Sequence, residues 1–369
     1  AGPSQSANSA PSGGSAAAQP QAWGDHTSAA GPSQGANSAP SGGSAAAQPQ
    51  AWGDHTNAFR SVELRKPRRA ERGLALIVAM LIAALAAAVA VSVATAQSQW
   101  SAQVSHRRDQ VQAQSIALAG IQWARQILEA DAQAGPIDDL NEPWALPLPP
   151  TPVQNGVVEG RIVDAQSLFN VNNLASATHA TFERRRFARL FATLGIPETT
   201  LASMIDWVDA DSVPQPDGAE DAWYLDQADA SLPPNAPATR IEELGSVRGM
   251  TIPAMTSVVR FITTLPVDTP LNVNTAPAEL LAASLDNVAP EQLAALVASR
   301  VERPFASLAD FRARLPGGAS IGDETMYSVG SRYFLVTVRA RQGETVAQAH
   351  ALIERANNAW PAIVWQTIE

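Results

Sequence analysis

The sequence predicts an α+β protein in which one long N-terminal helix packs on a small antiparallel sheet that is interrupted by a large helical insertion. Strand-like runs of β-branched and aromatic residues occur at 157–165, 333–340 and 345–354. The block between the first run and the later two, residues 174–315, has helical patterns. The chain has 369 residues, of which 46% are hydrophobic, and this is ample material for a core.

Residues 1–59 form a low-complexity tail with a tandem duplication. Residues 2–27 recur as 31–56, and the only change is that Gly35 stands where the first copy has Ser6. The tail has almost no Val, Ile, Leu or Phe, so it has too little apolar surface to offset the entropy of ordering. We expect this tail to be disordered.

A basic segment, residues 60–73, leads into a hydrophobic stretch. Residues 74–91 are all apolar, and no charge occurs between Leu74 and Arg107. At a rise of about 1.5 Å per residue, a helix over residues 74–96 crosses a bilayer core of about 30 Å. Basic charge before this helix predicts that the N-terminus is cytoplasmic and that the body lies on the other side.

The helix is expected to continue beyond the membrane as an amphipathic segment. Its apolar stripe comprises Trp100, Val104, Val111, Leu118, Ile121 and Leu128. We interpret this stripe mainly as the face that packs on the chain's own body, and its membrane-proximal half could pack against neighbouring subunits. Residues 135–152, rich in Pro, Asp and Asn, are expected to form a loop.

An acidic stretch in the helical block is a candidate metal site. It contains Asp206, Asp209, Asp211, Glu220 and Asp221. Carboxylates this close repel one another, and a divalent cation would neutralise them. Oxygen ligands on an irregular loop favour calcium. The alternative is a solvated acidic turn in which Asp206 caps a helix.

Charge and composition exclude several functional classes. The net charge is −10, and the residues after Gly73 carry 31 Asp and Glu against 19 Arg, so the surface repels phosphate backbones. The chain has no cysteine and therefore no disulfide, thiolate metal site or cysteine nucleophile. No residue pattern pairs a nucleophile with a base, and we expect no enzyme.

Residues 270–315 are similar to a helix-hairpin-helix module of the kind found in DNA-binding proteins. Asn274 and Thr275 are expected to cap its first helix, with Glu279 in the first turn. The turn at residues 285–290 has no glycine and carries an acidic residue, whereas a DNA-binding hairpin offers backbone amides to phosphate. We therefore interpret the module as structural or protein-binding.

Two further features have ordinary structural interpretations. Arg184, Arg185, Arg186 and Arg189 are expected to form a solvated helix face that meets acidic residues of the same domain or of a partner. His179 is expected to lie on a helix surface.

The junction between Gly73 and Leu74 resembles a prepilin peptidase cleavage site. A glycine before the cut lets the backbone enter a tight protease cleft, and the basic leader holds the site in the cytoplasm. The competing interpretation is an ordinary signal peptide that ends at Ala96. The apolar stretch is longer than the roughly 7 to 15 residues of such peptides, which favours a retained anchor.

Four further stretches are DAQSLFNVNNL (164–174), DWVDADSVPQPDGAEDAWY (206–224), IEELGSVRG (241–249) and PLNVNTA (270–276), and the strand VGSRYF lies downstream. Together they make the chain resemble protein K of type II secretion, a minor pseudopilin family. Most pilin-like subunits carry Glu at the fifth mature position, which is Val78 here. The same departure marks the protein K family.

The resemblance implies a pilin-like body, residues 97–173 and 316–369, around a SAM-like or helix-hairpin-helix-like insertion at 174–315. It implies a subunit at the tip of the periplasmic pseudopilus that supports export of folded proteins across the outer membrane. The implied partners are minor pseudopilins I and J, other pseudopilins and the prepilin peptidase. Cleavage after Gly73, methylation of Leu74 and calcium in the helical domain are also implied.

The expected location is the inner membrane of a Gram-negative bacterium, crossed once, with the C-terminal domain in the periplasm. No nucleic-acid partner is expected. The alternative is a membrane-anchored nucleic-acid-binding protein that uses the helix-hairpin-helix-like module.

Overall fold

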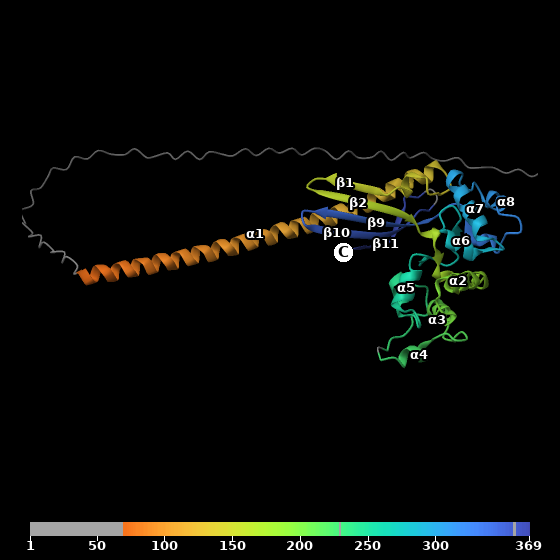
Figure 1. Cartoon of the computed structure of the whole chain (residues 1–369), viewed down its shortest axis with the longest axis horizontal. Helices are drawn as coiled ribbons and strands as arrows, with labels where there is room; N and C mark the ends of the chain where they lie inside the picture. The colour runs from red at the N-terminus through yellow and green to blue at the C-terminus, as the bar shows by residue number, and fades with distance from the viewer. Residues whose placement is uncertain (1–68, 229, 357–358) are drawn as a thin grey trace, which may run out of the picture. The chain divides into compact units, whose positions relative to one another are not determined.

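Figure 1 shows the computed structural model, which describes residues 69–228, 230–356 and 359–369. The tail expected to be disordered and most of the expected leader lie outside the described residues. The α-helices are α1 (Arg69–Ala134), α2 (Ala180–Leu194), α3 (Glu198–Val208), α4 (Asp221–Leu225), α5 (Ile252–Val258), α6 (Ala278–Ser284), α7 (Pro290–Glu302) and α8 (Leu308–Ala313). Short 3-10 turns are η1 (Pro143–Ala145), η2 (Ala165–Ser167), η3 (Val171–Ala175), η4 (Ile241–Ser246) and η5 (Glu324–Met326).

The strands form one larger sheet and three small pairs. They are β1 (Leu148–Val153), β2 (Gly156–Asp164), β3 (Phe169–Asn170), β4 (Ile262–Thr263), β5 (Leu271–Asn272), β6 (Leu285–Asp286), β7 (Ser320–Ile321), β8 (Tyr327–Ser328), β9 (Tyr333–Gln342), β10 (Thr345–Glu354) and β11 (Ala362–Ile368). The larger sheet has the order β1-β2-β9-β10-β11, and every neighbouring pair is antiparallel. The three strands predicted from the sequence are confirmed as β2, β9 and β10.

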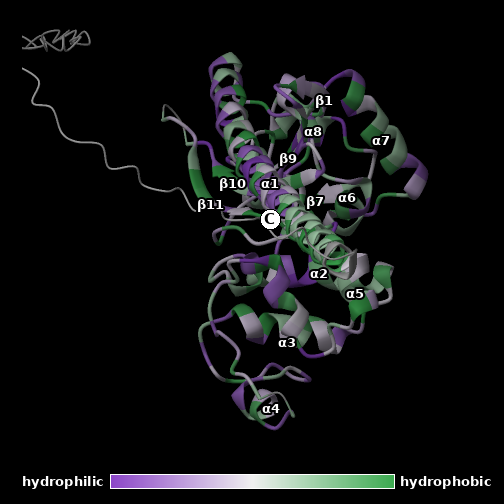
Figure 2. Ribbon diagram, turned by 90° about the vertical axis from the view of Figure 1, so that its left-hand side faces the viewer, coloured by the Kyte–Doolittle hydropathy of each residue, from purple (hydrophilic) through white to green (hydrophobic). Residues whose placement is uncertain are grey.

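The N-terminal part of α1 exposes its apolar side chains. From Leu74 to Val93 the leucine, isoleucine, valine and methionine residues are exposed, and the helix is long and apolar enough to cross a membrane. Figure 2 shows these turns in green. A single-pass membrane helix is thus consistent with the structure.

The C-terminal half of α1 packs on one face of the sheet. Its buried residues recur every three or four positions, which is one helical face. They are Ala113, Ala117, Ile121, Ala124 and Leu128. The facing sheet residues include Phe334, Val336, Val338, Ala349 and Ile353.

The predicted apolar stripe on α1 is only partly a core face. Ile121 and Leu128 are buried as expected. Trp100, Val104 and Val111 are 67%, 49% and 63% exposed, so the interpretation as a core face was wrong for them. The sheet ends level with the middle of α1, where the Thr345 hydroxyl meets the Nδ1 atom of His106 at 3.3 Å. None of the residues that the structure describes covers the turns before it.

The predicted loop at 135–152 was wrong at its end, because residues 148–153 form strand β1. This strand contains three prolines, which lack the N–H that an inner strand needs. It lies at the edge of the sheet, where the missing donors cost no ladder bond, and its pairing with β2 is irregular between Leu148 and Thr151.

The helical part, α2 to α8, has its own core of buried residues, including Phe187, Leu201, Leu244 and Phe311. Two of its small strand pairs, β3–β4 and β5–β8, are parallel. It lies beside the C-terminal end of α1 (Figure 1), where the Asn141 amide donates to the Val301 carbonyl at 2.9 Å. An α+β fold with a helical insertion is therefore confirmed.

The expected first helix of the helix-hairpin-helix-like module starts later than predicted. Helix α6 begins after Pro277, and Asn274 instead bonds the backbone of Phe305 through both amide atoms, at 2.8 and 3.1 Å. Thr275 donates to Asp164. In the turn before α7, Asn287 adopts a φ of 57°, which shows that an asparagine supplies the left-handed conformation without glycine.

The arginine cluster on α2 is less solvated than predicted. Arg186 is 1% exposed; it bonds Glu183 at 2.7 Å and lies over the Phe169 ring. Arg189 pairs with Asp286, so the expected contact with acidic residues of the same domain is confirmed. The prediction of a solvated position was wrong for Arg186. Its aliphatic side-chain carbons fill a core position, and its guanidinium forms an ion pair with the buried Glu183 carboxylate.

Candidate functional site

The acidic stretch forms a loop that folds back on the end of α3. Asp206 lies in the last turn of α3 and is buried, and its two carboxylate oxygens accept from the backbone N–H groups of Gln215 (3.0 Å) and Ala219 (2.7 Å). Gly218 passes so close that a Cβ there would overlap the Asp206 carboxylate. Asp206 therefore organises the loop, because each of its oxygens accepts one backbone hydrogen bond.

Three other carboxylates of the loop converge. Asp209 ends α3, Asp211 follows two residues later and Glu220 precedes α4, and one oxygen from each lies within 4.8 Å of the others. Both oxygens of Glu220 and the Oδ1 atom of Asp209 are buried and have no hydrogen-bond partner. Among the described residues no basic group forms an ion pair with any of the three.

The local electrostatics oppose the ionised state of these groups. Burial, followed by the charges of Asp206 and Asp209, raises the pKa of Glu220 to about 7. Burial, followed by Asp211 and Asp206, raises the pKa of Asp209 to about 6. Uncompensated buried carboxylates are costly, so the loop is suited to a bound cation.

Another polar side chain beside the acids, Asn235, was not predicted from the sequence, and it lies close enough to Glu220 to lower the pKa of that carboxyl. The Oδ1 atom of Asn235 is buried without a hydrogen-bond partner, while its amide nitrogen donates to Ser212 at 3.3 Å. Asn235 has a φ of 45°, and Asn is one of the few residues that adopt this conformation readily. No spacing rule relates residue 235 to the acidic stretch, so the sequence could not predict that Asn235 lies there. Its place after two prolines indicates only that it is a turn residue.

Of the five predicted metal-site residues, the structure brings together Asp209, Asp211 and Glu220. Asp206 accepts bonds from the loop backbone instead and does not cap a helix, while Asp221 begins α4 outside the group. We call Asp209, Asp211, Glu220 and Asn235 the acidic loop. Its donors are all oxygens on irregular backbone, which fits a hard cation such as calcium.

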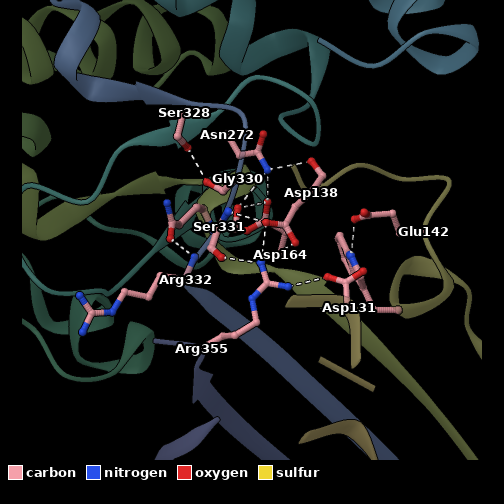
Figure 3. A network of polar contacts seen from close by, with 12 residues as sticks. Asp131, Asp138, Glu142, Asp164, Asn272, Ser328, Gly330, Ser331, Arg332 and Arg355 are labelled. Atoms are coloured by element: carbon pink, nitrogen blue, oxygen red, sulfur yellow. Dashed lines mark hydrogen bonds and ion pairs between the residues drawn. The ribbon is translucent and has the colours of Figure 1, made fainter. Parts of the chain in front are cut away.

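A second group of carboxylates lies where α1, the sheet and the helical part meet (Figure 3). Oxygens of Asp131, Asp138 and Glu142 also lie within 4.8 Å of one another. Here Arg355 donates to Asp131 at 2.5 Å and to both oxygens of Asp138 at 2.6 Å. The guanidinium supplies the positive charge that the acidic loop lacks.

Asp164, at the end of β2, completes this network. It is fully buried and accepts from the hydroxyls of Thr275 (2.5 Å) and Ser331 (2.6 Å), from the Asn272 amide (3.0 Å) and from the Gln166 backbone (2.8 Å). We call Asp131, Asp138, Asp164 and Arg355 with these donors the polar junction. The stretches DAQSLFNVNNL and PLNVNTA both contribute to it, so their spacing reflects how the insertion joins the body.

The expected processing residues, Gly73 and Leu74, lie in the first turns of α1. Leu74 is exposed, and so is Val78 at the fifth position after the expected cut. His179 lies at the start of α2 with its Nδ1 atom 2.5 Å from an Asp323 carboxylate oxygen. These residues have no contact with the acidic loop.

Comparison with known proteins agrees with the fold and the motifs. Two family models described as type II secretion system protein K match residues 167–267 and 271–330. Type II secretion system protein K of Pseudomonas aeruginosa is 34% identical over 246 residues, which are 63% of this chain and 73% of that protein. The protein of the same name from Pectobacterium carotovorum is 30% identical over 266 residues, 66% and 80% of the two chains.

A solved structure has the same fold. It is the crystal structure of the GspK-GspI-GspJ complex from the enterotoxigenic Escherichia coli type 2 secretion system. The likeness has a TM-score of 0.65 at 22% identity and covers 72% of this chain and 99% of that one. With the identity to the two relatives over most of their length, these findings show that the chain belongs to the type II secretion system protein K family, the minor pseudopilins.

Proposed function

We propose that this chain caps the tip of the periplasmic pseudopilus and so supports export of folded proteins across the outer membrane. In this proposal α1 anchors the chain in the inner membrane and the body stands in the periplasm. The observation that carries it is the arrangement along α1: the membrane-proximal turns are apolar and bare, and the helical insertion lies beside the C-terminal end. In such a subunit the exposed N-terminal part of α1 can pack against neighbouring subunits, and the helical insertion prevents another subunit from stacking beyond the C-terminal end of α1.

The residue at the fifth position after Gly73 supports a terminal place in the filament. Val78 offers no carboxylate to the amino terminus of a neighbouring subunit, a contact that would be strong in lipid. The likeness to the GspK chain of a three-protein complex supports minor pseudopilins I and J as partners. Packing against them would use the exposed stripe at Trp100, Val104 and Val111.

Mass spectrometry of the chain extracted from membranes tests this proposal. We expect a mature N-terminus at Leu74, with an N-methyl group added after the prepilin peptidase cuts. Affinity purification of the same chain should retain subunits I and J, and Val104→Asp with Val111→Asp should release them. A freely soluble chain that begins after Ala96 would contradict the proposal.

We also propose that the acidic loop binds calcium. Asp209, Asp211 and Glu220 would supply carboxylate oxygens and Asn235 an amide oxygen, and the ion would remove the repulsion among the three acids. Support comes from the four buried oxygens without partners. A bound ion would fix the segment between α3 and α4, two helices that already meet through Trp207 and Tyr224, whose ring centroids are 5.4 Å apart.

Thermal unfolding with calcium or with a chelator tests the calcium proposal. At 100 times the dissociation constant, calcium should stabilise the chain by about 2.7 kcal/mol. Asp209→Asn with Asp211→Asn should abolish the gain, whereas Asp221→Asn, an acid outside the group, should keep it. An unchanged gain in the double variant would show that the ligands are wrongly assigned.

The proposed role needs no catalysis. Among the described residues, His106 and His350 each meet a threonine hydroxyl, but neither pairs with a carboxylate. The alternative, nucleic-acid binding by the module at 270–315, is not favoured, because Asp286 in its turn pairs with Arg185 and Arg189. Their charge is therefore partly compensated within the chain.

A further inference from the structure

The face of the larger sheet turned away from α1 carries a recess between β1 and β9. Two adjoining cavities of about 440 and 240 Å³ share Pro150, Glu159 and Arg339 in their walls. We call this recess the arginine groove, and define it by Pro149, Pro150, Glu159, Arg161, Arg339 and Arg341. The strand register explains it, because residues two apart on β2 and β9 point to the same face.

Positive charge exceeds negative charge in the groove. Arg339 forms an ion pair with Glu159 at 3.3 Å. Among the described residues, Arg161 and Arg341 take part in no ion pair or side-chain hydrogen bond, and both are exposed. Three guanidinium groups therefore face one carboxylate. The other carboxylates of β9, β10 and their turn are Glu344, three residues after Arg341, and Glu354, which forms an ion pair with Arg332.

This charge is the reverse of that of the chain. The net charge is −10, and the other clusters of charged groups described above are acidic or internally paired. A local excess of arginine in an acidic protein is complementary to an acidic partner, and electrostatic complementarity selects partners and speeds their encounter.

The edge of the groove limits how a partner can bind. Pro149, Pro150 and Pro152 lack backbone donors, and the pairing of β1 is irregular at Leu148, so an added strand would find an interrupted ladder. Recognition must therefore use side chains. Guanidinium groups offer a planar fork of donors that matches a carboxylate, and the pyrrolidine rings supply an apolar wall.

We propose that the arginine groove binds a short acidic segment of another protein. Carboxylate side chains of that segment pair with Arg161 and Arg341, and its backbone lies against the prolines. The segment is short because the two cavities are small, and the net charge of −10 repels a long polyanion such as a nucleic acid or an anionic lipid surface. The groove does not involve the stripe on α1 or the acidic loop.

Fluorescence anisotropy of a labelled octaglutamate peptide, titrated with the full chain in neutral detergent at low salt, tests the proposal. Arg161→Gln with Arg341→Gln should weaken binding about tenfold, since each exposed ion pair contributes modestly. Both substitutions leave the ion pair between Arg339 and Glu159 intact. Arg107→Gln with Arg303→Gln removes the same charge from exposed positions elsewhere and should change binding less than twofold.

The proposal is overturned by no measurable peptide binding, by an equal loss in the control variant, or by tighter arginine-dependent binding of an eight-phosphate oligothymidylate than of the peptide. The last result would show a phosphate site instead. Replacing Arg161 and Arg341 by Lys keeps the positive charge but removes the planar guanidinium that binds a carboxylate through two hydrogen bonds. We expect the Lys variant to recover only part of the affinity lost in the Gln variant. Full recovery would contradict recognition by two-bond guanidinium–carboxylate pairs. Equal melting temperatures of all variants show that each is folded.

Discussion

The acidic loop and the polar junction each gather three or more carboxylates, but only the junction contains its own positive charge. At the junction Arg355 bonds two aspartates, and hydroxyl and amide groups donate to Asp164. In the acidic loop, oxygens of Asp209 and Glu220 are buried with no donor. Two clusters of carboxylates therefore differ in whether the protein itself supplies the groups that compensate their charge.

The difference shows what decides whether a group of acids needs an ion. Burying a charge is tolerated when the protein supplies partners for it, and otherwise the group must be protonated or bind a cation. At the junction the partners come from the strand end at Arg355 and from the insertion, so the contacts also dock the insertion on the body. In the acidic loop the missing partner is free to come from solution.

Breaking the junction should give the largest effect. Arg355→Ala leaves Asp131 and Asp138 as buried unpaired carboxylates, and removing one partner of such an ion pair costs about 3–5 kcal/mol. Urea unfolding of the purified chain measures this loss. Calcium should not restore it. The matched control is Arg332→Ala, which removes a half-exposed ion pair with Glu354 and should cost about 0–1 kcal/mol.

A change in the backbone of the acidic loop should have a medium effect. Gly218→Ala forces a Cβ against the Asp206 carboxylate, and overpacking of this kind costs about 1–3 kcal/mol. Because Asp206 holds the loop, the variant should also bind calcium more weakly. Melting temperatures with and without calcium measure both effects. The control Gly317→Ala, where a Cβ meets no atom within 4 Å, should leave calcium binding unchanged.

The pH dependence of stability tests both clusters at once. Burial raises the pKa of Glu220 and Asp131 to about 7 and of Asp209 and Asp164 to about 6, so the folded chain holds protons that the unfolded chain has released. This stabilisation is fully present below about pH 4 and is lost as the pH rises through 6 and 7. Melting temperatures measured from pH 5 to 8 with a chelator should therefore fall.

Calcium separates the two clusters in the same experiment. A bound ion keeps the acids of the loop ionised, so it should remove their part of the pH dependence and leave that of the junction. The calcium-induced gain should thus increase from pH 5 to 8. A gain that is constant over this range would contradict the assignment of Glu220 and Asp209 as ligands.

Much of the fold could be predicted from local patterns. The long apolar stretch of α1, strands β2, β9 and β10 and the helical block each follow from hydrophobic runs or periodicity, which depend on neighbours a few residues away. Strand β1 could not be predicted, because proline disfavours strands except at an edge, and no local signal tells which strand will be at the edge. The buried part of the apolar stripe on α1 was predicted to begin too early in the helix for a related reason, because the spacing of apolar residues does not show where the sheet ends.

The sequence by itself determined the long apolar helix, strands β2, β9 and β10 and three carboxylates of the acidic loop, because these depend on composition and short spacing. Only the tertiary structure decided that Asp206 serves the backbone, that Asn235 joins the loop and that Arg355 completes the junction. Arg355 lies 217 residues from Asp138. Contacts at that separation are fixed by how the insertion packs on the sheet, and no pattern within a segment encodes them.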